Sequence, residues 1–108
     1  MNIKSKDYNI SVNSESKQFL TEREIEYLSL IALGCHNQEI AKTLEVSYYT
    51  VKKTIELIFH KLDAADRANA VAIAFVHKIL DISTLNEIIN KYRLIKNIAL
   101  RKKITSNK

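Results

Sequence analysis

The sequence NQEIAKTLEVSYYTVKKTIELIFHKL, residues 37–62, decides the fold. Its pattern predicts a short helix, a three-residue turn at residues 45–47 and a longer second helix. Apolar residues recur at helical spacing in both segments, so each helix has one inward face. Two helices joined by so short a turn must cross steeply, which is the geometry of a helix-turn-helix whose second helix enters the DNA major groove. The predicted inward residues are Ile40, Ala41 and Leu44, then Val51, Ile55, Ile58 and Leu62.

The opposite face of the second helix is predicted to be polar and open to solvent. At about 100° per residue, it carries Tyr49, Lys52, Lys53, Glu56 and His60. Lysine can donate to guanine O6 and N7 or to phosphate, and a carboxylate can accept from cytosine N4. Asn37 and Ser47 are expected to cap the two helices by accepting from free backbone N–H groups.

The composition indicates an all-helical protein. The 108 residues include no proline and a single glycine, whereas sheet-rich folds use both residues at many turns. The single cysteine, Cys35, is expected to be a buried filler and fits a reducing cytosol. No apolar run reaches the roughly 18 residues that span a membrane, and the N-terminus lacks a signal-peptide pattern. We therefore expect a cytoplasmic protein with no membrane partner.

The net charge of +5 is unevenly distributed along the chain. Residues 20–80 contain seven basic and eight acidic side chains, whereas residues 81–108 contain seven basic and two acidic ones. The excess positive charge thus follows the helix-turn-helix instead of coinciding with it. Overall basicity is for this reason weak support for DNA binding by the central region.

Two further helices are predicted around the motif. Thr21 and Glu24 form a capping-box pattern that opens the first helix, and Gly34 can supply its left-handed stop. A later helix is predicted from about residue 67 to residue 80. The expected inner faces are Ile25, Leu28, Ile31 and Ala32 in the first of these helices, and Ala68, Val71, Ala74, Phe75 and Ile79 in the second.

The two ends of the chain differ in character. Residues 1–18 are polar and are expected to form a flexible arm. Residues 81–108 predict an amphipathic helix, capped by Ser83 or Thr84 and reaching about Lys103, followed by a basic tail. This helix either dimerises as a short coiled coil or folds back onto its own core. The candidate dimer seam is Leu85, Ile88, Tyr92, Ile95 and Ala99.

Four segments in order resemble the LuxR/GerE-type DNA-binding domain of bacterial transcription regulators: LTEREIEYLSLIALG, NQEIAKTLEVS, TVKKTIELIFHKL and DRANAVAIA. The resemblance covers about residues 19–80. It implies an all-α, four-helix domain whose third helix reads the major groove and which commonly dimerises through its last helix. It places the motif at residues 37–56, the base-reading positions on Lys52, Lys53 and Glu56, and the phosphate-facing threonine on Thr50. The additional C-terminal helix lies outside it, and the short N-terminal arm suggests a stand-alone regulator.

The sequence departs from the family pattern in the second helix of the motif. Glu56 stands where the family often has a basic or neutral residue, and Thr54 stands where a histidine is usual. Tyr48 and Tyr49 replace a small polar or charged pair. Tyr49 is expected to contact sugar or a thymine methyl, whereas Tyr48, nearer the apolar face, is expected to pack.

We therefore expect a sequence-specific transcription regulator that binds double-stranded DNA as a homodimer, on a pseudo-palindrome with half-sites ~10 bp apart. The alternative is an interaction module that binds another regulator or RNA polymerase without specific DNA readout. No set of groups suggests an enzyme or a cofactor, and the three histidines lie at no metal-ligand spacing with Cys35. The expected DNA-contacting residues are Asn37, Gln38, Lys42, Tyr49, Thr50, Lys52, Lys53, Glu56, His60 and Lys61.

Overall fold

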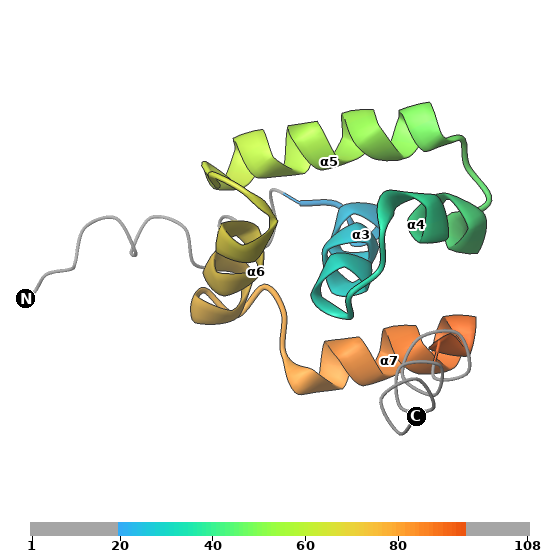
Figure 1. Cartoon of the computed structure of the whole chain (residues 1–108). Coiled ribbons are helices and arrows are strands. Elements are labelled where there is room, and N and C mark those ends of the chain that lie inside the picture. Colours follow the sequence, from blue (N-terminus) through green and yellow to red (C-terminus); the bar gives the residue numbers. More distant parts are fainter. Residues whose placement is uncertain (1–19, 95–108) are drawn as a thin grey trace, which may run out of the picture.

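The computed structural model describes residues 20–94, and within this range the chain forms five α-helices and no strand. The all-α prediction is confirmed. In Figure 1, α5 runs along one side of the molecule, α7 along the opposite side, and the other three helices lie between them. No helix in residues 20–94 is both long and apolar enough to cross a membrane. The helices are α3 (Glu22–Ala32), α4 (Asn37–Leu44), α5 (Tyr48–Leu62), α6 (Arg67–Val76) and α7 (Ile82–Tyr92).

The hydrophobic core surrounds α3, which contacts α5, α6 and α7. The predicted apolar stripe of α5 is confirmed, because Val51, Ile55, Ile58 and Leu62 are all buried. On α3 the buried surface is wider than one stripe and includes Tyr27 in addition to the expected Leu28 and Ile31. A helix packed on several sides needs apolar residues around more of its circumference than a surface helix does.

The start of α3 is the predicted capping box. The Thr21 hydroxyl accepts from the Glu24 N–H at 3.0 Å, and the Glu24 carboxylate accepts from the Thr21 N–H at 2.9 Å. At the other end Gly34 has a φ of 93°, as its predicted role as a left-handed stop requires. The Cys35 N–H then donates to the Leu30 carbonyl at 3.0 Å and closes the helix, and Cys35 itself is buried as expected.

The turn between α4 and α5 follows the prediction, but the start of α4 does not. Glu45 adopts a left-handed conformation with a φ of 59°, and Ser47 caps α5 by accepting from the Thr50 N–H at 3.0 Å. The predicted cap at Asn37 is wrong, because Asn37 is already helical and His36 is the N-cap residue. The His36 N–H donates to the Glu39 carboxylate at 2.8 Å, so a carboxylate in the first turn stabilises this helix start.

Helix α6 is shorter than predicted, and its inner face agrees with the prediction only in part: Ala74 is buried as expected. It ends at Val76 instead of residue 80, and its buried residues are Ala70 and Ala74, while Ala68 and Phe75 are exposed. Beyond the helix, the N–H groups of residues 79 and 80 both donate to the Ala74 carbonyl, at 2.8 and 3.1 Å. This bend directs Ile79 into the core after the helix has ended.

Helix α7 folds back onto α3, so the fold-back alternative describes this part of the chain. Asp81, instead of Ser83 or Thr84, caps it by accepting from the Thr84 N–H at 2.7 Å. The helix ends at Tyr92, where Arg93 has a φ of 55°, and does not continue unbroken towards Lys103. Of the predicted dimer seam, Ile88 is buried in the core, Leu85 and Tyr92 are half-buried, and Ile95 and Ala99 lie outside the described residues.

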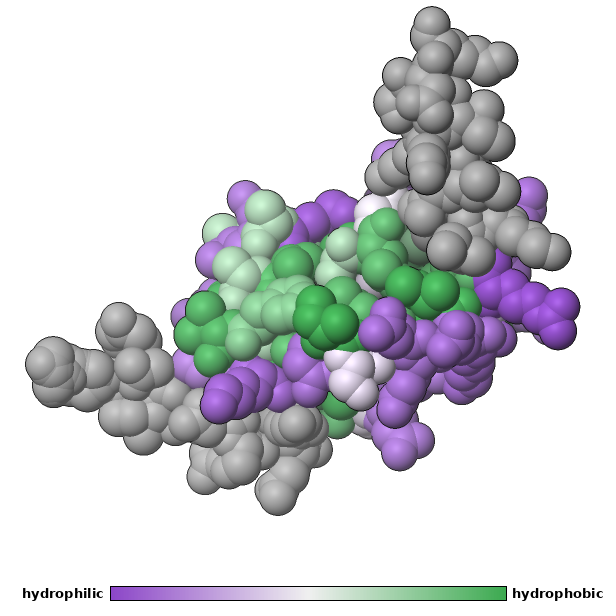
Figure 2. Space-filling model, turned by 90° about the horizontal axis from the view of Figure 1, so that it is seen from below, coloured by the Kyte–Doolittle hydropathy of each residue, from purple (hydrophilic) through white to green (hydrophobic). Residues whose placement is uncertain are grey.

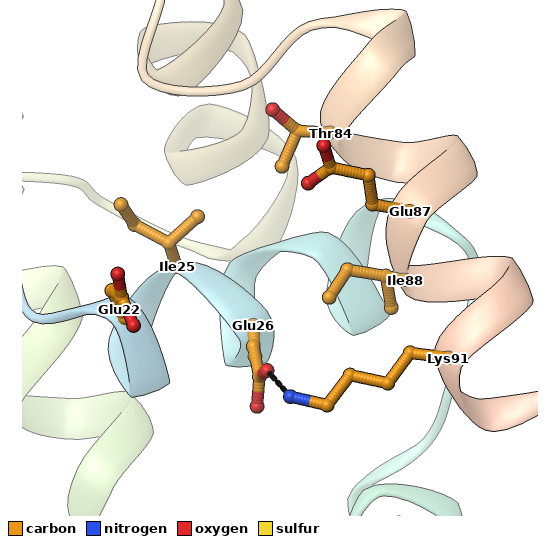
Figure 3. Close-up of a pocket in the computed structure, with 7 residues that line it drawn as sticks. All are labelled: Glu22, Ile25, Glu26, Thr84, Glu87, Ile88 and Lys91. Atoms are coloured by element: carbon orange, nitrogen blue, oxygen red, sulfur yellow. Dashed lines mark hydrogen bonds and ion pairs between the residues drawn. The ribbon is translucent and has the colours of Figure 1, made fainter.

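A pocket of about 280 Å³ lies between α3 and α7. Figure 3 shows Lys91 reaching from α7 to the Glu26 carboxylate of α3 across one end of it. The same carboxylate accepts from the Tyr92 hydroxyl at 2.9 Å and from the Arg23 guanidinium at 3.0 Å. We call these four side chains the Glu26 cluster; it fastens α7 to the domain. The pocket is lined by Glu22, Ile25, Glu26, Thr84, Glu87, Ile88 and Lys91.

Candidate nucleic-acid interface

The outward side of α5 is a continuous exposed surface. Since Val51, Ile55 and Ile58 hold the helix to the core, the side chains opposite them point away from the molecule. A helix of 15 residues is about 22 Å long and fits a major groove about 12 Å wide. We call this surface the α5 face; its exposed members are Tyr49, Thr50, Lys52, Lys53, Glu56, Leu57 and His60.

Three members of the α5 face interact with one another. The Lys53 ammonium lies 3.8 Å from a carboxylate oxygen of Glu56 and 5.7 Å from the centre of the Tyr49 ring. The lysine and glutamate side chains keep 57% and 60% of their surface exposed, so both remain able to contact a ligand. The centre of the face therefore presents a cation and an anion together, beside an aromatic ring that is 67% exposed.

Thr50 is positioned by the cap of α5. The Ser47 hydroxyl donates to the Thr50 hydroxyl oxygen at 2.9 Å while accepting from the Thr50 N–H. Because a hydroxyl group has one donor and two acceptor sites, Thr50 keeps its own proton for another acceptor. A phosphate oxygen is such an acceptor.

The three predicted DNA-contacting residues of α4 differ in exposure. Gln38 and Lys42 are exposed, whereas Asn37 is half-buried. The Asn37 side-chain oxygen accepts from the Arg67 guanidinium at 2.9 Å, and Arg67 also donates to the Cys35 carbonyl at 2.8 Å. This oxygen of Asn37 thus helps to fasten the start of α6 to the start of α4.

Lys61 lies away from the α5 face. Its ammonium is 3.0 and 3.1 Å from the two carboxylate oxygens of Glu24, and only 17% of its side-chain surface is exposed. The structure therefore places Lys61 between α3 and α5, away from the other predicted DNA-contacting residues of α5.

Two exposed side chains near this surface were not anticipated. Tyr48 was expected to pack but is 51% exposed, because it is the first residue of α5 and the burial of that helix begins only at Val51. Leu57 is 47% exposed and is absent from the predicted contact residues. Its position beside Lys53 and Glu56 on a helical wheel is the sequence signal that would have found it.

The whole α5 face lies within a region that matches a known family. Residues 18–74 match the model described as "Bacterial regulatory proteins, luxR family", which is more than half of the chain. The chain belongs to the luxR family. The predicted family, a helix-turn-helix domain of bacterial regulatory proteins, is confirmed. Helix α7 lies beyond the matched residues.

Curated relatives of this luxR-family domain include the proteins named "Response regulator protein VraR" of Staphylococcus aureus, Staphylococcus epidermidis and Staphylococcus saprophyticus. Each is 45% identical over 67 residues, which cover 62% of this chain and 32% of the relative. The chain therefore spans about a third of the length of these relatives. No solved structure matches it. Within residues 20–94, no group of three or more His, Cys, Asp or Glu side chains is placed to hold a metal ion.

Proposed function

We propose that this luxR-family domain binds specific DNA sequences through the α5 face and acts on them as a homodimer. The observation that carries the proposal is the two-sided character of α5: a fully apolar stripe is buried, and the polar side is open along the helix. A helix held in this way can enter a major groove without disturbing the core, because none of its outward side chains is needed for packing.

The members of the α5 face divide into two roles in this proposal. Lys52, Lys53 and Glu56 point outward at mid-helix, where base edges are reached, and their groups match acceptors and donors of the groove. Thr50 and His60, near the two ends of the helix, are assigned to the phosphate strands, and so are Gln38 and Lys42 of α4. Asn37 and Lys61, which bond to Arg67 and Glu24, are assigned to holding the helices in place.

The homodimer is proposed to form through the outer side of α6. Phe75 is 36% exposed and Val76 is 70% exposed, and the exposed Ala68 and Ala72 allow a second helix to approach closely. Ile88 of the predicted seam is committed to the domain's own core, which favours α6 over α7. Two such domains would place their α5 helices on half-sites ~10 bp apart.

One observation favours the alternative, an interaction module that binds RNA polymerase or another regulator. Residues 20–94 contain nine basic and ten acidic side chains, so this part of the chain has no excess positive charge to attract a duplex. Sequence-independent DNA binding depends mainly on such charge. The exposed Tyr48 and Leu57 would suit a protein partner as well.

A gel-shift titration over salt concentration, on random DNA and on duplexes selected from genomic fragments, separates the two functions. Lys52→Ala and Lys53→Ala should each weaken binding to the selected duplex by about 1–3 kcal/mol if these residues read bases. Lys78→Asn is a matched control, because it removes the same charge from an exposed residue outside α5, and asparagine tolerates its φ of 62°. Unchanged binding by both α5 variants, or no preference of the parent protein for any duplex, would contradict the proposal.

A further inference from the structure

We propose that Lys53 and Glu56 act as one unit that selects a single G·C base pair, and that Tyr49 is the residue that positions it. The assignment rests on the DNA-binding function proposed above and adds the base pair that the α5 face prefers. It begins from the arrangement at the centre of that face, where a donor and an acceptor are held side by side. The Lys53 ammonium and the nearest Glu56 oxygen are 3.8 Å apart.

The major-groove edge of a G·C pair offers the complementary pattern. Guanine presents the O6 and N7 acceptors, and cytosine presents the N4 amino donor. Guanine O6 and cytosine N4 are themselves hydrogen-bonded, so they lie about 2.9 Å apart. An ammonium and a carboxylate separated by 3.8 Å can therefore engage both bases of one pair, Lys53 on guanine and Glu56 on cytosine.

An A·T pair offers a poorer match to the same unit. Adenine N6 can donate to a carboxylate and thymine O4 can accept from an ammonium, but the neighbouring groups are unfavourable. The carboxylate would lie beside the adenine N7 acceptor, and the ammonium would lie beside the thymine methyl group. In the G·C pair, by contrast, guanine N7 is a second acceptor for the ammonium. The unit is therefore expected to prefer G·C in one orientation.

Tyr49 limits where the Lys53 ammonium can go. The ammonium lies 5.7 Å from the ring centre, within the range of a cation–π contact, and the ring stands one helical turn before it. A lysine held between an aromatic ring and a carboxylate samples fewer positions than a free one. Tyr49 therefore acts through Lys53 as a positioning residue.

Glu56 also explains how a nearly neutral domain can be selective. A carboxylate on the helix that enters the groove repels phosphate and weakens binding to every duplex. The repulsion is offset only where cytosine N4 donates to it, so Glu56 lowers affinity in general and restores it at one base pair. Discrimination by a repulsive group of this kind is a common source of specificity.

The test uses the full chain and the duplex that the parent protein prefers among random sequences. Fluorescence anisotropy would give the Kd for that duplex and for copies in which each base pair is replaced in turn. The parent should lose about tenfold in affinity when one particular G·C pair per half-site becomes A·T. Replacing that guanine by 7-deazaguanine, which lacks the N7 acceptor, should also weaken binding of the duplex by the parent protein.

The variants Lys53→Ala and Glu56→Ala should both lose this preference at the same base pair, and Glu56→Ala should bind random DNA more tightly than the parent. Tyr49→Ala should reduce the preference without moving it to another position. Glu87→Ala is the matched control, because Glu87 is an exposed glutamate of α7, on the side of the molecule opposite α5 (Figure 1). Its removal should change neither the base-pair preference nor the affinity for random DNA.

Two outcomes would overturn the assignment, and they differ in whether the parent protein prefers any duplex over random DNA. If Glu56→Ala binds all duplexes more tightly but keeps every base preference, Glu56 only repels phosphate and the G·C unit is refuted, while DNA binding stands. If the parent itself prefers no duplex over random DNA, the proposed function fails, and the base-pair assignment fails with it.

Discussion

Lys53 and Lys61 show how two lysines of one helix can have different roles. Lys53 is exposed on the α5 face, whereas Lys61 contacts both carboxylate oxygens of Glu24, which is itself only 9% exposed at its side chain. Glu24 also accepts from the Thr21 N–H, so one carboxylate joins the start of α3 to the end of α5. The difference lies in partners distant in sequence, and a helical wheel cannot supply them.

We expect Lys61→Met to lower the free energy of unfolding by about 2 kcal/mol, because it leaves a nearly buried carboxylate without its cation. Lys52→Ala, at an exposed position of the same helix, should stay within about 0.5 kcal/mol of the parent. Urea denaturation followed by circular dichroism would compare the two variants. Equal stability of Lys61→Met and Lys52→Ala would show that the ion pair with Glu24 contributes nothing.

At the scale of the helices, α7 is joined to the domain by the Glu26 cluster, of which Figure 3 shows Glu26 and Lys91. Burial favours the neutral form of Glu26, but hydrogen bonds from Lys91, Tyr92 and Arg23 outweigh it and lower the pKa of this carboxyl below its ordinary value of 4.5. The hydrogen bond to Glu26 in turn raises the pKa of Lys91 above 10.5. The interactions are thus strongest while both groups are charged.

The attachment of α7 should therefore depend on pH in a defined direction. The stability that Glu26 contributes to the attachment of α7 is fully present above pH 4.5 and is lost as pH falls through the lowered folded-state pKa of Glu26. The stability that Lys91 contributes is fully present below pH 10.5 and is lost as pH rises through the raised pKa of Lys91. Amide NMR signals of residues 82–92 should shift at the acidic end before those of α5. In Glu26→Gln this early acidic change should be absent; if it persists, another group controls α7.

Local sequence signals predicted the helices well where the cause was local. The capping residues Thr21 and Ser47, the stop at Gly34 and the apolar stripe of α5 all follow from side chains within a few positions. Three errors came from long-range packing or backbone conformation that such signals do not encode. Asn37 bonds to Arg67 instead of capping α4, α6 buries Ala70 instead of Ala68 and Phe75, and α7 ends where Arg93 takes a positive φ.

For the candidate site, the sequence predicts which residues are exposed but not how their side chains are placed. The polar residues opposite the α5 stripe are exposed as predicted, because the 3.6-residue period alone places them there. The pairing of Lys53 with Glu56 is also local in sequence, yet its distance of 3.8 Å depends on the rotamers of two long side chains. No period reports a rotamer, so the donor and acceptor unit could be found only in the structure.

At the scale of the whole molecule, the excess positive charge lies outside the residues that the structure describes. Residues 95–108 contain five basic and no acidic side chains, and Leu94 just before them is buried in the core. A truncation after residue 94 keeps every described residue of the core and removes these five basic side chains. If those residues bind phosphate, the slope of log K against log salt should become shallower by about 0.9 for each phosphate that is no longer neutralised. An unchanged slope would mean that they bind no phosphate.

The proposed homodimer can be tested by comparing two exposed apolar residues on different helices. Figure 2, which views the molecule from the side of α7, shows hydrophobic side chains gathered along this face between hydrophilic ones. Val76 at the end of α6 and Ile82 at the start of α7 are 70% and 67% exposed, so neither contributes much to the core of one domain. A charge introduced at either position should leave the monomer folded, and any effect on association will report the helix that pairs.

We expect Val76→Glu to shift sedimentation from dimer to monomer, because two carboxylates would be buried close to the two-fold axis of an α6 interface. Its binding to a two-half-site duplex should weaken by more than about tenfold, while binding to a single half-site should stay near that of the parent, since the variant loses effective concentration and keeps the α5 face. Ile82→Glu should leave both properties unchanged. The reverse result, with only Ile82→Glu monomeric, would assign dimerisation to α7. A parent that binds the two-half-site duplex no more tightly than a single half-site would mean that one domain recognises its DNA alone.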